Sequence, residues 1–165
     1  MRLSHLVATV GLVGHLRPAP GTWGSLAALP LAWGLHAAGG PWALGGAIVA
    51  GFAAGLWATH RESAGRADPD ASEIVMDEVV GQWIAFWPVS LGAAHVGVPI
   101  TALWPGWAAA FVLFRLFDIW KPGPVGRADR RGDALGVMLD DLIAGLFAAL
   151  GVVGLAAMAH LGMGV

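Results

Sequence analysis

The sequence predicts an all-α membrane protein, a polytopic bundle of about four to five transmembrane helices with an N-terminal interfacial segment. Three observations support this prediction: the apolar content, the scarcity of charge and the long stretches without any charge. Apolar residues make up 57% of the 165 residues, and charged residues only 12%, about half of the ~25% that is usual in soluble domains. A water-soluble domain of this length needs more polar surface than that. Residues 1–165 are predicted to form one domain.

The helices follow from the charge-free stretches. No Lys, Arg, Asp or Glu occurs in residues 18–60, 79–114 or 142–165. The first two stretches are each long enough for two crossings, at ~20 residues a crossing, and they are broken near residues 39–41 and 97–105, where Gly and Pro favour a turn. We therefore predict helices near residues 22–38, 42–59, 79–96, 102–117 and 142–161. Gly51 and Gly55, four residues apart, predict close packing of the second of these helices.

The distribution of basic residues predicts the orientation. If the helices alternate in direction, all nine Lys and Arg lie on one side, which the positive-inside rule assigns to the cytoplasm. Arg17-Pro18 argues against a span before it, so an interfacial helix is predicted at the N-terminus. A net charge of −2 with few basic residues argues against a nucleic-acid partner. The absence of Cys excludes disulfides and thiolate chemistry.

Acidic residues occupy unusual positions at the ends of apolar segments. Asp77 and Glu78 lie directly before an apolar helix, Asp140 and Asp141 lie between two apolar runs, and Asp118 is surrounded by Phe, Leu, Ile and Trp. Carboxylates in such places are costly unless they are paired or bind a cation. Five carboxylates without Cys or paired His favour Mg²⁺ over zinc. The alternative is that Asp77, Asp140 and Asp141 open helices and interact with the helix dipole.

Basic and hydroxyl side chains complete a candidate phosphate site. Arg115, Asp118 and Lys121 recur every three residues along one helix face. The two cations can hold a phosphate, although an ion-pair ladder of little energetic value is the simpler interpretation. Thr22 or Ser25 can cap the first hydrophobic helix, whose free N–H groups could receive an anion, and a plain turn with an N-cap is the alternative there.

Three ordered sequence blocks resemble one known family. They are PAPGTWGSLAALP from Pro18, EIVMDEVVGQWIAFWP from Glu73 and FRLFDIWKPGPVGRADRRGDALGVMLDDLIAG from Phe114. Together they resemble phosphatidylglycerophosphatase A, a family of bacterial Mg²⁺-dependent enzymes of phosphatidylglycerol synthesis. Where that family usually has Gly-Gly-x-Gly before the paired aspartates, this chain has Gly132-Asp133-Ala134-Leu135-Gly136. Asp133 therefore has either a new role or an effect on the stiffness of this loop.

The resemblance implies a lipid phosphate monoester hydrolase that converts phosphatidylglycerophosphate to phosphatidylglycerol at the cytoplasmic face of the bacterial inner membrane. It implies activity at Asp77, Glu78, Asp118, Lys121, Asp140 and Asp141, with Thr22, Ser25 and Arg115 as weaker matches. We predict that Mg²⁺ is held by a subset of Asp77, Glu78, Asp118, Asp140 and Asp141. Asp118, Lys121 and Asp141 are the predicted catalytic residues, and Thr22, Ser25, Arg115 and Lys121 the predicted substrate-binding residues.

Two points of this hypothesis stay open at the level of the sequence. Water attacks phosphorus in the favoured mechanism, and a covalent aspartyl-phosphate on Asp118 is its alternative. The competing functions are a membrane transporter that uses the acids as an ion path and a non-catalytic assembly subunit. Membrane lipids are expected partners, and an oligomer is possible without being predicted.

Overall fold

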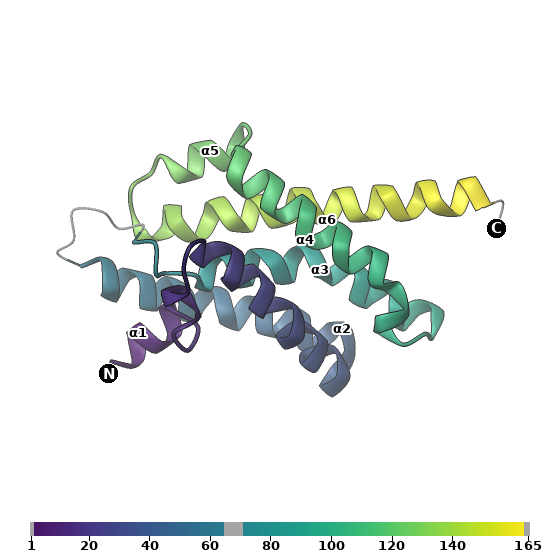
Figure 1. Cartoon of the computed structure of the whole chain (residues 1–165), viewed down its shortest axis with the longest axis horizontal. Coiled ribbons are helices and arrows are strands. Elements are labelled where there is room, and N and C mark those ends of the chain that lie inside the picture. The colour runs from purple at the N-terminus through teal and green to yellow at the C-terminus, as the bar shows by residue number, and fades with distance from the viewer. Residues whose placement is uncertain (1, 65–70, 164–165) are drawn as a thin grey trace.

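The computed structural model describes residues 2–64 and 71–163, which are helical and contain no strand. The helices are α1 (Leu3–Ala8), α2 (Pro20–Ser63), α3 (Met76–Val96), α4 (Trp104–Trp120), α5 (Pro124–Asp129) and α6 (Ala134–Met163), with short 3-10 turns η1 (Val13–His15) and η2 (Ile100–Leu103). In this part of the chain, four helical segments are long and apolar enough to cross a membrane: α2, α3, Ile100–Trp120 and α6. The prediction of an all-α membrane bundle is confirmed (Figure 1).

Helix α2 is folded back on itself at the predicted break. Gly39 and Gly40 leave the helical conformation, and Gly40 has a φ of +63°, which favours glycine. Both arms of α2 pack on α3. Trp83 Nε1 donates a hydrogen bond to the Ala28 carbonyl of the first arm (3.0 Å), and Trp87 Nε1 donates one to the Pro41 carbonyl at the start of the second arm (2.8 Å). The expected helices near 22–38 and 42–59 are thus the two arms of α2.

Helix α3 forms the centre of the bundle, and glycine residues allow α2 and α6 to pack closely against it. A Cβ atom on Gly51 of α2 would lie only 3.2 Å from Met76 Cε and Val80 Cγ2 of α3, and one on Gly55 would lie 3.0 Å from Met76 Cγ. These contacts confirm the predicted close packing at Gly51 and Gly55. On the opposite side of α3, a Cβ on Gly145 of α6 would collide with the Gly81 carbonyl oxygen.

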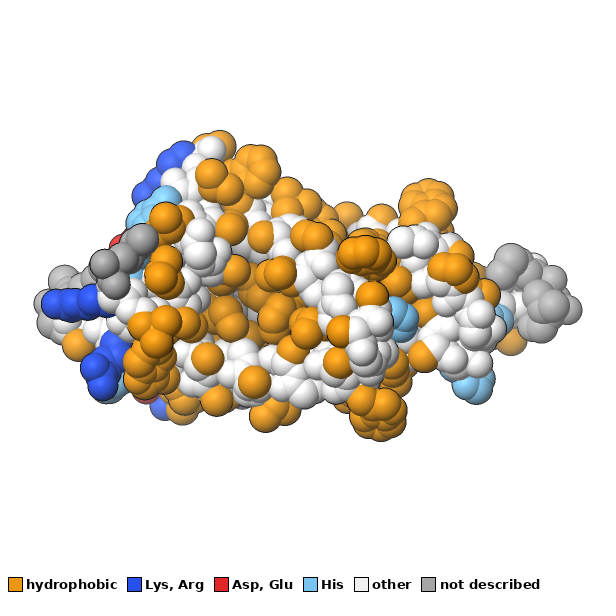
Figure 2. Space-filling model, turned by 90° about the horizontal axis from the view of Figure 1, so that it is seen from below, with side chains coloured by type: hydrophobic (Ala, Val, Ile, Leu, Met, Phe, Trp, Pro, Cys, Tyr) orange, Lys and Arg blue, Asp and Glu red, His pale blue; other side chains and the backbone are white. Residues whose placement is uncertain are grey.

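The two ends of the bundle differ in charge. The turns at residues 39–40 and 97–103 contain no charged residue, whereas the starts of α3 and α6, the end of α4 and all of α5 lie at the other end, which we call the charged end. In Figure 2 the Lys and Arg side chains are seen at that end only, and apolar side chains cover the middle of the visible face. Arg66 lies outside the described residues. Large apolar side chains such as Trp42, Val49 and Leu150 are exposed, as lipid contact requires.

Helix α6 begins eight residues earlier than predicted. It starts at Ala134, and the Asp133 carboxylate accepts a hydrogen bond from the Gly136 N–H (2.7 Å), as a helix N-cap does. Asp140 and Asp141 therefore lie about two turns inside α6, and the alternative that they open a helix is wrong. Asp77 and Glu78 do lie in the first turn of α3. The prediction placed the start of α6 at the first residue after the last charged residue. The helix starts earlier, because its buried face includes the charged residues Asp140 and Asp141.

We expect Gly145→Ala to destabilise the protein, because the added methyl group has no room against the backbone of α3. Overpacking of this kind costs about 1–3 kcal/mol, which a lowered melting temperature in detergent would show. The matched control is Gly154→Ala, further along α6, where nothing lies within 4 Å of the added atom. An equal loss of stability in both variants would contradict the close α3–α6 contact.

Candidate active site

Three carboxylates from two helices converge at the charged end. Asp77 and Glu78 come from the first turn of α3, and Asp141 comes from the third turn of α6. One oxygen atom of each lies within 4.8 Å of those of the other two. The side chains of Asp77 and Asp141 are buried, and Glu78 is partly buried. The close contact of α3 and α6 at Gly81 and Gly145 holds the turns that carry these acids side by side.

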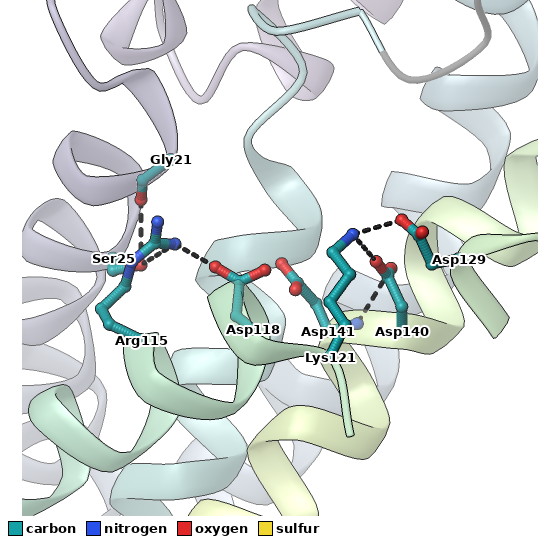
Figure 3. A network of polar contacts seen from close by, with 8 residues as sticks. All are labelled: Gly21, Ser25, Arg115, Asp118, Lys121, Asp129, Asp140 and Asp141. Atoms are coloured by element: carbon teal, nitrogen blue, oxygen red, sulfur yellow. Dashed lines mark hydrogen bonds and ion pairs between the residues drawn. The ribbon is translucent and has the colours of Figure 1, made fainter. Parts of the chain in front are cut away.

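Asp118, in the last turn of α4, adds a fourth carboxylate to this group. Figure 3 shows the Asp118 and Asp141 carboxyl groups side by side, within hydrogen-bonding reach of each other. Asp118 Oδ2 also pairs with Arg115 Nη1 at 2.5 Å. Carboxylates this close repel each other unless a cation or a proton lies between them. Arg115 supplies part of the required positive charge.

Lys121 holds Asp140 on the other side of the cluster. It ends α4 in the left-handed conformation, with a φ of +50°. Its ammonium group donates to Asp140 Oδ2 at 2.8 Å and also to Asp129 of α5 (Figure 3). Burial opposes the charge on Lys121, but the hydrogen bonds to Asp129 and Asp140 outweigh it and raise the pKa of Lys121 above its usual value. The ammonium group therefore stays charged.

The first arm of α2 supports Arg115 from the other side. Arg115 Nη1 donates to Ser25 Oγ at 3.5 Å, and the Ser25 hydroxyl donates to the Gly21 carbonyl at 2.9 Å. Ser25 is fully buried and lies behind Arg115, whereas Thr22 lines the open cleft next to it. The structure therefore brings both hydroxyl residues to the site, at different depths. The prediction that one of them caps the helix is wrong, because α2 starts at Pro20 and has no side-chain cap.

An open cleft of about 380 Å³ gives access to these groups from outside the bundle. Its polar lining comes from α2, α3, α4 and the segments beside them: Thr22, Ser72, Glu78, Arg115, Asp118 and Lys121. Carboxylates and cations on one wall can receive a divalent cation and a phosphate group together. Asp77, Asp140 and Asp141 are buried and do not line the cleft.

The donor atoms of the cluster fit Mg²⁺. Asp77, Glu78 and Asp141 offer only oxygen atoms, and among the described residues no His or Cys joins them. Glu78 Oε2 is buried and has no hydrogen-bond partner within the described part of the chain. Such an oxygen is normally paired or coordinated. Asp118 and Asp140 are engaged by Arg115 and Lys121, so their predicted roles as ligands stay predictions.

Two residues of this site were absent from the sequence prediction. Asp129 holds Lys121, but in the sequence it is one acid among many in a charged segment. Gly21 is needed because a Cβ atom there would collide with Glu78 Oε1 and lie 3.3 Å from Arg115 Nη1. The only sequence signal for Gly21 is its place in the PAPGTWGS block.

Comparison with known proteins identifies the family. The model of phosphatidylglycerophosphatase A matches residues 6–156. The chain belongs to this family. It is 38% identical to phosphatidylglycerophosphatase A of Escherichia coli over 148 residues, which cover 88% of this chain and 78% of the relative. The Haemophilus influenzae phosphatidylglycerophosphatase A is 34% identical over 152 residues, 88% of this chain and 84% of the relative.

A third relative has a different name. A putative phosphatidylinositol-3-phosphatase of Bacteroides thetaiotaomicron is 36% identical over 135 residues, with 78% of each chain covered. No solved structure matches this chain significantly.

We expect Gly21→Ala to weaken Mg²⁺ binding with little loss of stability, because the added methyl group displaces the mobile end of Glu78 and not the backbone. We expect Mg²⁺ to raise the melting temperature of the wild type, and to raise that of Gly21→Ala by less. Gly34→Ala is the matched control, since it lies on the same arm of α2 with nothing within 4 Å of the added atom. An unchanged Mg²⁺ response in Gly21→Ala would remove Glu78 from the cation site.

Proposed function

We propose that this protein hydrolyses the phosphate monoester of phosphatidylglycerophosphate and releases phosphatidylglycerol and inorganic phosphate. Membership of the phosphatidylglycerophosphatase A family supports this function. The observation that carries it is the meeting of Asp77, Glu78 and Asp141 with Arg115 and Lys121 at one end of an apolar bundle. A lipid phosphate reaches such a place with its acyl chains still beside apolar helices.

The cation in this proposal is Mg²⁺, held by Asp77, Glu78 and Asp141. When bound, Mg²⁺ stabilises negative charge on phosphoryl oxygens and makes water a better nucleophile. The carboxylates come from two helices whose backbones are in contact, so they are positioned before the cation binds. Positioning and charge are the main requirements of phosphoryl transfer.

The remaining residues act directly on the substrate in this proposal. Arg115 and Lys121 offset the charge of the phosphoryl oxygens, the first as a two-pronged donor and the second as a point charge. Asp118 lies between them along α4, orients the attacking water and accepts its proton. The P–O bond to the glycerol oxygen then breaks, and the leaving oxygen takes up the proton that Asp118 accepted from water. In the alternative mechanism, Asp118 itself attacks phosphorus and water hydrolyses the aspartyl-phosphate.

We place the charged end at the cytoplasmic surface of the bacterial inner membrane. The positive-inside rule supports this orientation, because the described Lys and Arg residues gather at that end. The acids are equally one-sided: the described Asp and Glu side chains lie at the charged end, and no line of acids crosses the bundle. That distribution supports hydrolysis at a headgroup and gives no support to a transporter.

We expect the purified protein in detergent to release inorganic phosphate from phosphatidylglycerophosphate in the presence of Mg²⁺, and EDTA to stop the release. Asp141→Asn should abolish it, because a neutral amide replaces the buried carboxylate that α6 contributes to the cluster. Phosphate release and the melting temperature are the two measurements.

The matched control is Asp133→Asn, the same chemical change at the start of the same helix. Asn is as good an N-cap as Asp, and Asp133 lies outside the cleft, so its phosphate release should stay within about twofold of the wild type. Near-normal turnover in Asp141→Asn would exclude Asp141 from the mechanism. Ion flux without phosphate release would favour a transporter.

The orientation can be tested by labelling single cysteines, since the chain has none of its own. We expect a membrane-impermeant maleimide to label Val98→Cys, in the turn after α3, from the outside of spheroplasts. Arg130→Cys, at the charged end after α5, should be labelled only once the membrane is opened. The reverse pattern would place the site on the outer face.

A further inference from the structure

We propose that Gln82 is a positioning residue that links the cation site to the phosphate site by hydrogen bonding to Glu78 and Arg115 when the cation and the phosphate are bound. This inference rests on the proposed function and extends it to a residue outside the cleft. Gln82 is fully buried in α3. Both its Oε1 and its Nε2 lack a hydrogen-bond partner among the described residues. An amide in that state destabilises a protein, so its presence calls for a function.

The hydrogen-bond donor and acceptor that the Gln82 amide lacks are both present in the site. Among the described residues, Glu78 Oε2 is a buried acceptor without a donor, and Arg115 Nε is a buried donor without an acceptor. A glutamine amide has one group of each kind. Its Nε2 can donate to Glu78, and its Oε1 can accept from Arg115. None of these hydrogen bonds is formed in the structure without ligands, but one side chain has both groups that the two buried atoms need.

The fold brings these three side chains to the same level of the bundle. Gln82 follows Glu78 by four residues on α3, so both side chains lie on one face of the helix. Helical side chains lean toward the N-terminus, which directs the Gln82 amide back toward Glu78. Gln82 follows Gly81 on α3, and Arg115 follows Phe114 on α4. These two helices are in close contact here, because a Cβ atom on Gly81 would collide with the ring of Phe114. Glu78 and Arg115 are themselves close, since both lie within 3.3 Å of a Cβ atom placed on Gly21.

The consequence is a connection between two binding events. A cation draws the Glu78 carboxylate toward Asp77 and Asp141, and a phosphate draws the Arg115 guanidinium toward the cleft. A shared amide restricts the rotamers of both side chains. Removal of a residue that hydrogen-bonds to a metal ligand typically lowers metal affinity or activity by about 10- to 100-fold.

The test is Gln82→Met, which keeps the length and volume of the side chain and removes both polar atoms. Without Mg²⁺ the variant should melt at the same temperature as the wild type or higher, because a partnerless buried amide has been replaced by an apolar group. The Mg²⁺ concentration that gives half of the melting-temperature shift should rise by about 10- to 100-fold, and kcat/KM for phosphatidylglycerophosphate should fall by a similar factor.

Ser90→Ala is the matched control on the same helix. Ser90 is also fully buried, but it is hydrogen-bonded to His36 Nδ1 at 2.7 Å and is remote from the cleft. Its loss should lower the melting temperature and leave both Mg²⁺ affinity and turnover unchanged. This is the behaviour of a buried polar residue whose role is only structural.

Two results would overturn the role of Gln82. A lower melting temperature of Gln82→Met without Mg²⁺ would mean that the amide is already partnered and serves the fold. An unchanged Mg²⁺ affinity would mean that it does not act on Glu78. If the wild type releases no phosphate, the proposed function fails, and the Mg²⁺-dependent melting of the two proteins still decides the role of Gln82.

Discussion

The main physical constraint on this structure is the repulsion between carboxylates that lie close together at one end of an apolar bundle. Asp77, Glu78 and Asp141 lie together with Asp118 beside them, in surroundings where an uncompensated charge is costly. Positive charge from Arg115 and Lys121 offsets the outer acids, but both cations act at the rim. In the proposed function, a divalent cation offsets the charge of the inner carboxylates.

The fold serves this cluster through contacts between backbones. Because Gly81 and Gly145 bring α3 and α6 into direct contact, the turns that carry Asp77, Glu78 and Asp141 start side by side. Helix α4 packs against the same face of α3, with Phe114 on Gly81. This contact places Arg115 and Asp118, which are also on α4, at the cluster. Short contacts of this kind are how helices associate where water is absent. The precision of the site thus comes from the part of the bundle surrounded by lipid.

The sequence predicts the helices better than it predicts their contacts. Lengths of charge-free sequence predict the spans, and Gly39-Gly40 predicts the fold-back of α2, because both depend on local composition. The convergence of Asp77 and Asp141 could be expected because both precede long charge-free stretches, although Asp141 lies about two turns inside α6. Asp129 and Gly21 could not, because each matters only through a residue far along the chain or on another helix. The early start of α6 was missed for a similar reason: its charged residues face protein, and their burial is a tertiary property.

The ion pairs at the rim make cation binding and phosphate binding depend on each other in the proposed function. Lys121 is held by Asp129 and Asp140, and Arg115 by Asp118, so a phosphate has to compete with carboxylates for both cations. A divalent cation among the acids weakens the hold of Asp118 and Asp140 on these partners, because it attracts the same negative charge. By linkage, a bound phosphate then strengthens the binding of the cation by the same factor. A headgroup without its terminal phosphate offers no such exchange, so this coupling favours binding of the substrate over the dephosphorylated product.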